Sequence, residues 1–421
     1  MAIVGVRGAT TLQDEVELQA HLATLLRLEN LGLLLGAGAS VAAGGKTMQG
    51  LWNDFVETTP EDAHWLVDEQ FLSAAAVAAG EGRSVPNVEE LGDALEIALV
   101  EWRRSAHVNL PQLERARAQL TRAVVRAARL KPEWWMSPGG AESDAEQLQH
   151  HRAILQKLVG ARQAGQAAPW IFTTNYDLAI EWAAESIDLN AVNGFLGVHG
   201  RRFSPQSFDL GFRNTQARGE ARFGVYNIYL AKLHGSLSWR EDEGQVYEVQ
   251  APLAGEQIET FLADATLTEL GLLVMPRAAK YMQTTGYVFG ELFRRFSEFL
   301  SRPQASLLVC GYGFGDEHIN RLMRSALLNP TLQLVIYFPG FSGDSRAPEL
   351  PEALRKLLSL KNPRVTVVGG GEEAFLDKLA AQLPDPLLYD EDMRRLEKAL
   401  RESRGVADSP ETAEVMPEPW Q

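Results

Sequence analysis

The sequence predicts an α/β protein in which a doubly wound parallel sheet carries one large helical insertion. Two observations support this fold class. Over the second half of the chain, short apolar runs alternate with helical patterns, which is typical of a parallel sheet covered by helices on both faces. Residues 51–165 show no convincing strand and are rich in Ala, Leu, Glu, Arg and Gln with helical periodicity.

Composition narrows the class of protein. The 421 residues suffice for two or three structural units, and 45% of them are hydrophobic. No run of roughly 18 apolar residues and no secretory signal pattern occurs, so we expect a cytoplasmic protein without a membrane span. The net charge of −15 disfavours direct nucleic-acid binding. Cys310 is the single cysteine, which excludes an intrachain disulfide and a multi-cysteine zinc site.

The elements of the sheet can be placed from their patterns. An amphipathic helix is expected at 13–29, followed by a buried strand at 31–35 that enters a glycine turn. The remaining strands are expected at 169–174, 225–233, 270–275, 305–310, 332–338 and 364–368. Helical patterns separate several of them, at 176–187, 287–301, 316–328, 350–360 and 372–383. A small hairpin at 237–250 should turn at Glu243 and Gly244.

These elements suggest a division of the chain. Residues 1–50 and 166–385 should form the sheet domain, with residues 51–165 as an inserted helical module. Helices within the insertion are expected at 62–79, 89–106, 111–130 and 143–163. Residues 386–421 should form a C-terminal helix, at 390–403, and a tail that is disordered or depends on a partner.

Two motifs follow the first strands of the sheet. The sequence GAGAS at 36–40 could bring backbone amides and the Ser40 hydroxyl close to a phosphate, although a tight strand–helix turn explains its glycines equally well. The sequence TTNYD at 173–177 lies at the carboxyl end of a strand, where open α/β sheets bind ligands. Asn175 or Asp177 could instead cap the next helix, which by itself is the commoner role.

Two further motifs lie at later strand ends. His234, in KLHGS at 232–236, has a side chain that titrates near working pH, but a lone histidine in a turn is more often structural, as the second His-Gly pair at His199 illustrates. The sequence CGYGFGD at 310–316 carries glycines suited to close approach of a ribose or adenine, and Asp316 could cap the following helix. Cys310 reads as a buried strand residue.

The order GAGAS, TTNYD, KLHGS and CGYGFGD resembles the sirtuin superfamily, and more closely the bacterial sirtuin-like NADases of antiphage defence. The segments KLHGSLSW, LVMP at 273–276 with Lys280 after it, and GYGFGDEHIN are typical of that branch. The resemblance spans roughly residues 31–340, interrupted by the helical insertion.

This resemblance implies a Rossmann-like fold that binds NAD as its substrate. It implies that Asn175 orients the ribose and the attacking nucleophile and that His234 is the catalytic histidine, while Asp177 could orient a neighbouring group. The residues implied to bind NAD are Gly36, Ala37, Gly38, Ser40, Thr174, Gly311 and Tyr312.

The chain departs from deacylating sirtuins in ways that favour plain hydrolysis of the nicotinamide–ribose bond. The four zinc cysteines are missing, no zinc is expected, and the segment after the glycine turn reads GKTMQ, without the Asp-Phe-Arg element of deacylases. Gly313 stands where many relatives carry serine. Two alternatives remain: an NAD-dependent deacylase or ADP-ribosyltransferase, and a non-catalytic NAD-sensing subunit.

The resemblance also bears on assembly. It implies a homo-oligomer and a hexameric HerA-type ATPase as partner, in a system that depletes NAD during phage infection. Because constitutive NAD hydrolysis would kill the cell, some gate on the activity is expected.

Overall fold

A nine-stranded sheet forms the centre of the molecule. The computed structural model describes residues 4–12, 14–80, 83–136, 146–163, 165–212, 226–272 and 285–385. From one edge of the sheet to the other, the strands are β2 (Thr10–Thr11), β1 (Val4–Arg7), β13 (Val365–Gly369), β12 (Gln333–Tyr337), β11 (Ala305–Cys310), β3 (Asn30–Leu35), β4 (Trp170–Thr173), β8 (Asn227–Lys232) and β5 (Asn190–Val192). The strands from β13 to β5 run parallel, and only β1 and β2 are antiparallel to their neighbours.

The inner strands confirm most of the predicted ones. Strands occur where they were expected around 31–35, 169–174, 225–233, 305–310, 332–338 and 364–368. The strands β3, β11 and β13 are buried at every position, as expected for strands covered on both faces. Half of the strand predicted at 270–275 lies outside the described residues, and the described half, 270–272, is not in a strand.

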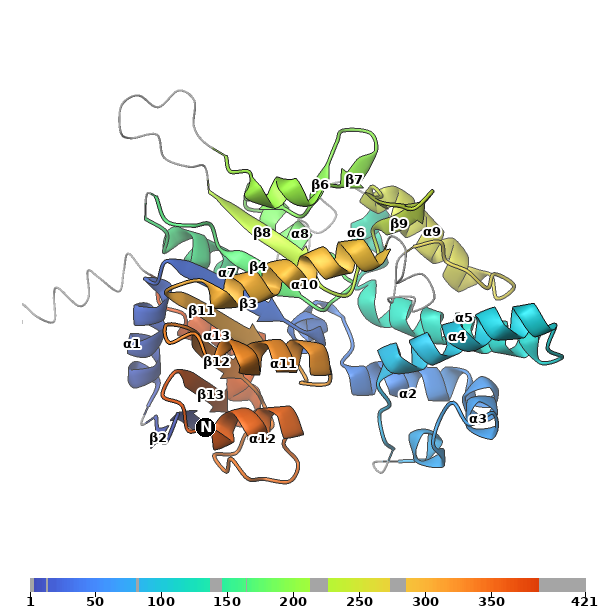
Figure 1. Cartoon of the computed structure of the whole chain (residues 1–421), viewed down its shortest axis with the longest axis horizontal. Helices are drawn as coiled ribbons and strands as arrows, with labels where there is room; N and C mark the ends of the chain where they lie inside the picture. The colour runs from blue at the N-terminus through green and yellow to red at the C-terminus, as the bar shows by residue number, and fades with distance from the viewer. Residues whose placement is uncertain are drawn as a thin grey trace, which may run out of the picture.

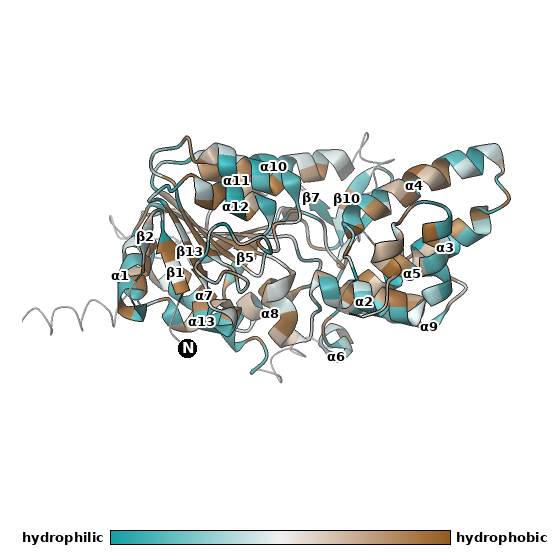
Figure 2. Ribbon diagram, turned by 90° about the horizontal axis from the view of Figure 1, so that it is seen from below, coloured by the Kyte–Doolittle hydropathy of each residue, from teal (hydrophilic) through white to brown (hydrophobic). Residues whose placement is uncertain are grey.

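Helices cover both faces of the sheet (Figures 1 and 2). One face carries α10 (Thr285–Ser301), α11 (Glu317–Ala326) and α12 (Glu352–Ser359), whose apolar residues share a core with β11, β12 and β13. The other carries α1 (Glu15–Leu26), α7 (Gln149–Gly160), α8 (Ala179–Glu185) and α13 (Leu376–Gln382). The fold is therefore the expected Rossmann-like, doubly wound α/β sheet.

A helical module lies beside the sheet, on the right of Figure 1. It consists of α2 (Met48–Thr58), α3 (Pro60–Asp68), α4 (Val88–Ser105), α5 (Leu110–Ala128) and α6 (Pro132–Met136). The later helix α9 (Ala251–Ala263) packs against α5 and α6 and joins their core. By contrast, α7 packs against α8 and α13 on the sheet, so the last helical segment before β4 covers the sheet.

The module and the sheet share apolar contacts. Trp182 of α8 lies edge-on to both Trp134 and Trp135 of α6, with ring centroids 5.4 and 5.3 Å apart. Leu178 and Leu237, which flank the motifs at the sheet edge, belong to the same core as the module. Burial of such large aromatic rings is a major source of interface stability, so the module is firmly docked at this edge.

The start of the module differs from its prediction. The helix expected at 62–79 is wrong, because α3 ends at Asp68 and Gln70 takes a left-handed backbone with φ 64°. A turn and the short 3₁₀ helix Ala74–Val77 follow. The helix α2 begins at Met48, before the predicted module, where the Thr47 side chain accepts a hydrogen bond from the Gly50 amide.

A smaller antiparallel sheet consists of β6 (Phe195–Leu196), β7 (Arg201–Phe203), β10 (Gln245–Glu248) and β9 (Trp239–Asp242). The predicted hairpin is confirmed as β9 and β10. Its turn residues Glu243 and Gly244 have φ values of 46° and 75°, as a type I′ turn requires. The predicted helix at 390–403 and the tail lie outside the described residues. None of the helices in the described ranges combines the length and the apolar character that crossing a bilayer requires.

The order of the strands reverses between β3 and β11. From β3 the chain builds β4 and β8 to one side, and β11, β12 and β13 then extend the sheet to the other side. In open α/β sheets, ligands bind at the carboxyl ends of the strands beside such a reversal. The GAGAS and CGYGFGD turns both begin there.

Candidate functional site

The two glycine-rich turns at the strand reversal are packed directly against each other. The Gly36 amide donates to the Cys310 carbonyl oxygen at 3.1 Å, and the Gly38 amide donates to the Gly311 carbonyl oxygen at 2.9 Å. Gly311 has φ 67°, and a Cβ there would overlap the Ala39 amide nitrogen. A Cβ on Gly36 would lie 2.5 Å from the Gly311 carbonyl oxygen. These glycines therefore permit a close approach of two backbones.

This packing bears on the predicted phosphate site. The amides of Gly36 and Gly38 donate within the protein, and the Ala39 amide donates to the Gly36 carbonyl oxygen at 2.9 Å. A phosphate would have to compete for these hydrogen atoms. The sequence pattern signalled the glycines correctly, while direct contact of Gly36, Ala37 and Gly38 with NAD stays a prediction.

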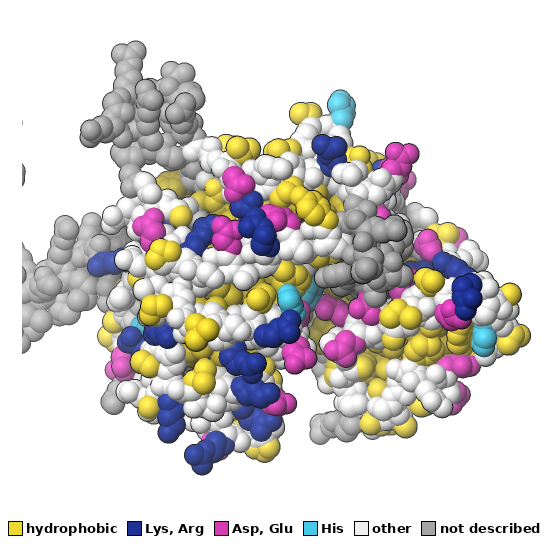
Figure 3. Space-filling view, in the orientation of Figure 1, with side chains coloured by type: hydrophobic (Ala, Val, Ile, Leu, Met, Phe, Trp, Pro, Cys, Tyr) yellow, Lys and Arg dark blue, Asp and Glu magenta, His cyan; other side chains and the backbone are white. Residues whose placement is uncertain are grey.

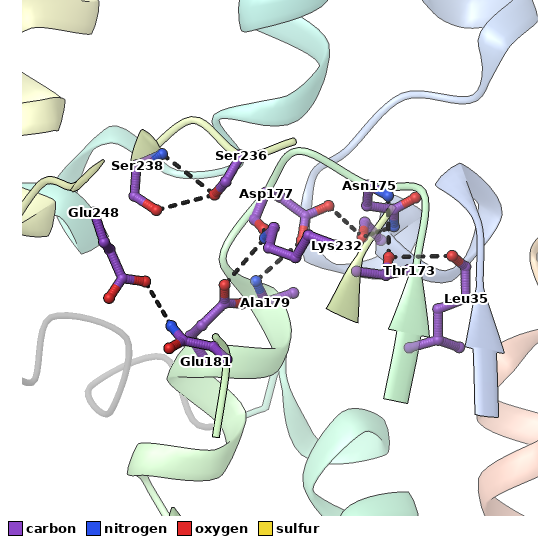
Figure 4. Close-up of polar contacts among 12 residues, drawn as sticks. Leu35, Thr173, Asn175, Asp177, Ala179, Glu181, Lys232, Ser236, Ser238 and Glu248 are labelled. Carbon is purple, nitrogen blue, oxygen red and sulfur yellow. Dashed lines mark hydrogen bonds and ion pairs between the residues drawn. The ribbon is translucent and has the colours of Figure 1, made fainter. Parts of the chain in front are cut away.

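Asn175 and Asp177, which are labelled in Figure 4, lie in the loop after β4, and both bond to Ser40, which follows β3. The Asn175 side-chain Nδ2 donates to the Gly36 carbonyl oxygen at 3.0 Å and to Ser40 Oγ at 2.9 Å. Ser40 Oγ in turn donates to Asp177 Oδ2 at 2.7 Å. The other carboxylate oxygen of Asp177 accepts from the Ala179 amide at 3.0 Å. Neither residue is the N-cap of α8, which is Leu178: Asp177 lies one residue earlier and accepts from the first amide of the helix, whereas Asn175 reaches across to the glycine turn.

Threonines hold the Asn175 loop in place. Thr173 Oγ1 donates to the Leu35 carbonyl oxygen at 3.1 Å and accepts from the Asn175 amide at 3.0 Å. The half-buried Thr174 bonds to the same carbonyl through its amide at 3.0 Å, so its predicted contact with NAD stays untested. Thr173 is a positioning residue that the sequence argument did not single out, although the motif contains it.

Lys232 holds the same loop in place by bonding to its backbone. Its side chain is only 2% exposed, and Nζ donates to the Asp177 carbonyl oxygen and lies 3.1 Å from Glu181 Oε1. Burial raises the pKa of Glu181, although the charge of Lys232 opposes that shift. A buried lysine requires such partners. Lys232, the first residue of KLHGS, therefore helps to fix the conformation of the TTNYD loop.

Backbone hydrogen bonds join the turn that carries His234 to the loop that carries Asn175. The Leu233 amide donates to the Thr173 carbonyl oxygen at 2.8 Å, and the Leu237 amide donates to the Tyr176 carbonyl oxygen at 2.9 Å. The motifs TTNYD and KLHGS are therefore neighbours at the sheet edge, as the parallel pairing of β4 with β8 predicts.

His234 is buried between two carboxylates. Its Nδ1 lies 2.5 Å from Glu89 Oε1, and its Nε2 lies 2.8 Å from Asp316 Oδ2. Burial alone would lower the pKa of His234, but the charges of Glu89 and Asp316 and their hydrogen bonds raise it to about 10. Burial would likewise raise the pKa of Asp316, yet the bond to His234 holds it below its usual value. The imidazole is therefore charged at neutral pH.

Sequence reasoning found only part of this arrangement. Asp316 caps α11 as expected, because Oδ1 accepts from the Ile319 amide at 3.0 Å, but its second oxygen also holds His234. Glu89 was missed entirely, since it lies in the first turn of α4, where acidic residues are common. No local signal distinguishes Glu89 from its neighbour Glu90.

Three of these side chains could in principle hold a metal ion. Glu89, His234 and Asp316 offer ligand atoms within 4.8 Å of one another. The two carboxylates, however, bond to different nitrogens of one ring, on opposite edges of the imidazole. A metal ligand must present one unprotonated nitrogen, whereas this geometry protonates both. The arrangement fits an ion-pair clamp on His234.

Around these residues the surface is hollowed. Figure 3 shows a recess between the part of the molecule that carries α11 and α12 and the part that carries α2 and α4, with acidic side chains gathered along it. Gly313 faces open space, since a Cβ there would meet nothing within 4 Å. The Tyr312 ring is buried in the core, and its hydroxyl lies 3.0 Å from the Asp316 carbonyl oxygen. The predicted contacts of Gly311 and Tyr312 with NAD stay predictions.

Comparison with known proteins supports a sirtuin-like family. Residues 169–362 match the family model described as a SIR2-like domain. The matched segment contains TTNYD, KLHGS and CGYGFGD, and it excludes GAGAS and the helices α2 to α6 of the module. SIR2-like domains are in general parts of NAD-dependent enzymes, so the match supports an NAD-related function. No curated protein matches the chain.

Proposed function

We propose that this protein hydrolyses NAD to nicotinamide and ADP-ribose. The observation that carries the proposal is the convergence of Asn175, His234 and two glycine turns at the strand reversal of a sheet whose sequence matches a SIR2-like domain. The single cysteine provides no four-cysteine zinc module, which favours hydrolysis over deacylation.

The reaction does not require a general acid, because the leaving group does not need a proton. The nicotinamide ring of NAD is positively charged and becomes a neutral molecule when its bond to the ribose breaks. The sugar carbon then develops oxocarbenium character. The site must hold the ribose, exclude bulk water and position one water molecule for attack. A general base that takes the proton of this water, or of a ribose hydroxyl, speeds the step.

The local geometry suggests how the residues divide this work. Nδ2 of Asn175 is directed to Gly36 and Ser40, so the substrate would meet Asn175 through its carbonyl oxygen Oδ1. An amide oxygen accepts hydrogen bonds and can therefore orient a water or a ribose hydroxyl. His234, once neutral, would serve as the base, and Asp177 would keep Ser40 and hence Asn175 in position.

The test is nicotinamide release from NAD by the purified full chain. Asn175→Ala and His234→Ala should each lower release at least about a hundredfold, the usual scale for a lost base or positioning group. The control is His199→Ala, because His199 lies in the other His-Gly pair and is exposed. Circular dichroism and melting confirm the fold of each variant. Unchanged release by the Asn175 and His234 variants would refute the assignment.

The biological setting is also a proposal. We propose that the hydrolase acts in antiphage defence as a homo-oligomer that pairs with a hexameric HerA-type ATPase, in line with the motif resemblance. Light scattering measures the oligomer, and release with and without a co-expressed ATPase measures the pairing. An acylated peptide offered with NAD separates hydrolysis from deacylation or ADP-ribosyl transfer.

The non-catalytic alternative has one observation in its favour. Both nitrogens of His234 are engaged by carboxylates, so His234 is not available as a base in the described conformation. A pure sensor would bind NAD, as measured by calorimetry, and release no nicotinamide under any condition that frees His234.

A further inference from the structure

The inserted module reaches the candidate base through one side chain. Glu89 lies in the first turn of α4, and its Oε1 lies 2.5 Å from His234 Nδ1. Asp316 holds the opposite nitrogen at 2.8 Å. A histidine that donates from both nitrogens has no lone pair with which to accept a proton. One of the two carboxylates must therefore leave before His234 can act as a base.

The two carboxylates are held with different strength. Asp316 is anchored by its cap of α11, through the 3.0 Å bond from the Ile319 amide. Its side chain is 15% exposed. The side chain of Glu89 is 30% exposed, and α4 packs chiefly against α5 of its own module. Glu89 is therefore the more exposed of the two carboxylates and has no backbone anchor like that of Asp316, although it also interacts with the buried Tyr176 hydroxyl.

We propose that Glu89 is a latch on the site: it occupies the nitrogen of His234 that a water or ribose hydroxyl must reach, and it releases that nitrogen when the start of α4 shifts. The consequence for catalysis rests on the proposed hydrolase function, whereas the effect of Glu89 on the charge of His234 does not. The latch gives the helical module control over a site that the sheet builds.

The surroundings of His234 make this latch strong. Three acidic groups, Glu89 and Asp93 of α4 and Asp316 before α11, act on the buried Tyr176 hydroxyl. His318 of α11 contacts the ring of Phe293, which also lies beside His234. Burial raises the pKa of Tyr176 and of Tyr312, so both phenols stay neutral and contribute no charge. The carboxylates of Glu89 and Asp316 are thus the groups that keep His234 charged.

The first experiment reads the charge of His234 directly. Histidine-labelled full-length protein is titrated from pH 6 to pH 10.5 by NMR, and the His234 signal is assigned by its loss in His234→Gln. Glu89→Gln should lower the pKa of His234 by at least about one unit, because it removes one of the two negative charges that stabilise the charged imidazole. Glu89→Asp, which keeps the charge but shortens the side chain, should give a smaller decrease. Glu90→Gln is the matched control, since Glu90 is the exposed neighbour in the same helical turn.

The second experiment reads nicotinamide release at pH 7 in the same proteins. Glu89→Gln should raise release at least about tenfold, while Glu90→Gln should match the wild type. An unchanged pKa of His234 in Glu89→Gln overturns the latch, and so does a lowered pKa accompanied by slower release than in the wild type. If the pKa falls while neither protein releases nicotinamide, the latch on His234 stands and the hydrolase proposal fails.

Discussion

Replacing Gly311 with alanine tests whether the two glycine turns are locked together. Gly311 has φ 67°, and its missing Cβ leaves room for the backbone nitrogen of Ala39. Backbone on both sides of the contact cannot rotate away as a flexible side chain would. The alanine must therefore move the CGYGFGD turn relative to the GAGAS turn.

The magnitude follows from the contacts that this movement weakens. A left-handed backbone costs a residue with a Cβ about 1–2 kcal/mol. The shift also stretches the bonds from Gly36 to Cys310 and from Gly38 to Gly311, each of which contributes about 1 kcal/mol. The sum predicts a loss of about 3–4 kcal/mol. Gly313→Ala, in open space two residues later, should change the free energy of unfolding by less than about 0.5 kcal/mol.

Urea unfolding followed by tryptophan fluorescence measures both variants, and NAD binding by calorimetry shows whether the locked turns also shape the ligand site. The reasoning is refuted if Gly311→Ala is as stable as Gly313→Ala, because close packing of the two backbones predicts a cost at Gly311 alone.

Two other predictions concern buried charges. The pKa of His234 is raised to about 10, so the stability that its charged form contributes is fully present below pH 6.5 and is lost as the pH rises to about 10. The advantage of wild type over His234→Gln in unfolding free energy should shrink by about 1.4 kcal/mol per pH unit in that window, and a constant difference would contradict the ion pairs. Glu181→Leu removes the carboxylate that pairs with the buried Lys232 and should lower the free energy of unfolding by about 3–5 kcal/mol. Glu298→Ala breaks an exposed pair with Arg294 and should lower it by less than about 0.5 kcal/mol in the same unfolding assay.

The sequence predicted the sheet well because a buried parallel strand has a local signature. The apolar runs that end at Leu35, Thr173 and Cys310 are each followed by small or polar residues. These three strands are parallel neighbours, so their carboxyl ends lie side by side. The contact between Ser40 and Asn175 follows from that arrangement. The strands β1, β2 and β5, at or next to the two outer edges of the sheet, were missed because none of them forms an apolar run: β2 and β5 have only two and three residues, and Val4–Arg7 is interrupted by glycine and ends in arginine.

The partners of His234 show where local reasoning ends. Asp316 carries a capping signal, and its second role depends on the pairing of β11 with β3, which brings α11 to the site. Glu89 reaches His234 only because the module docks at the sheet edge through Trp182 and its aromatic neighbours. Nothing in the periodicity of α4 encodes the direction of that docking.

The site therefore depends on parts of the chain outside the segment that matches a SIR2-like domain. The match begins at residue 169, yet Ser40 holds Asn175 and Asp177 from before it, and Glu89 holds His234 from the inserted module. The matched segment supplies the groups that would act on NAD, and the preceding residues determine how those groups are oriented and charged. If the charge of His234 decides whether the base can act, then Glu89, which lies outside the matched segment, contributes to the control of a base that lies inside it.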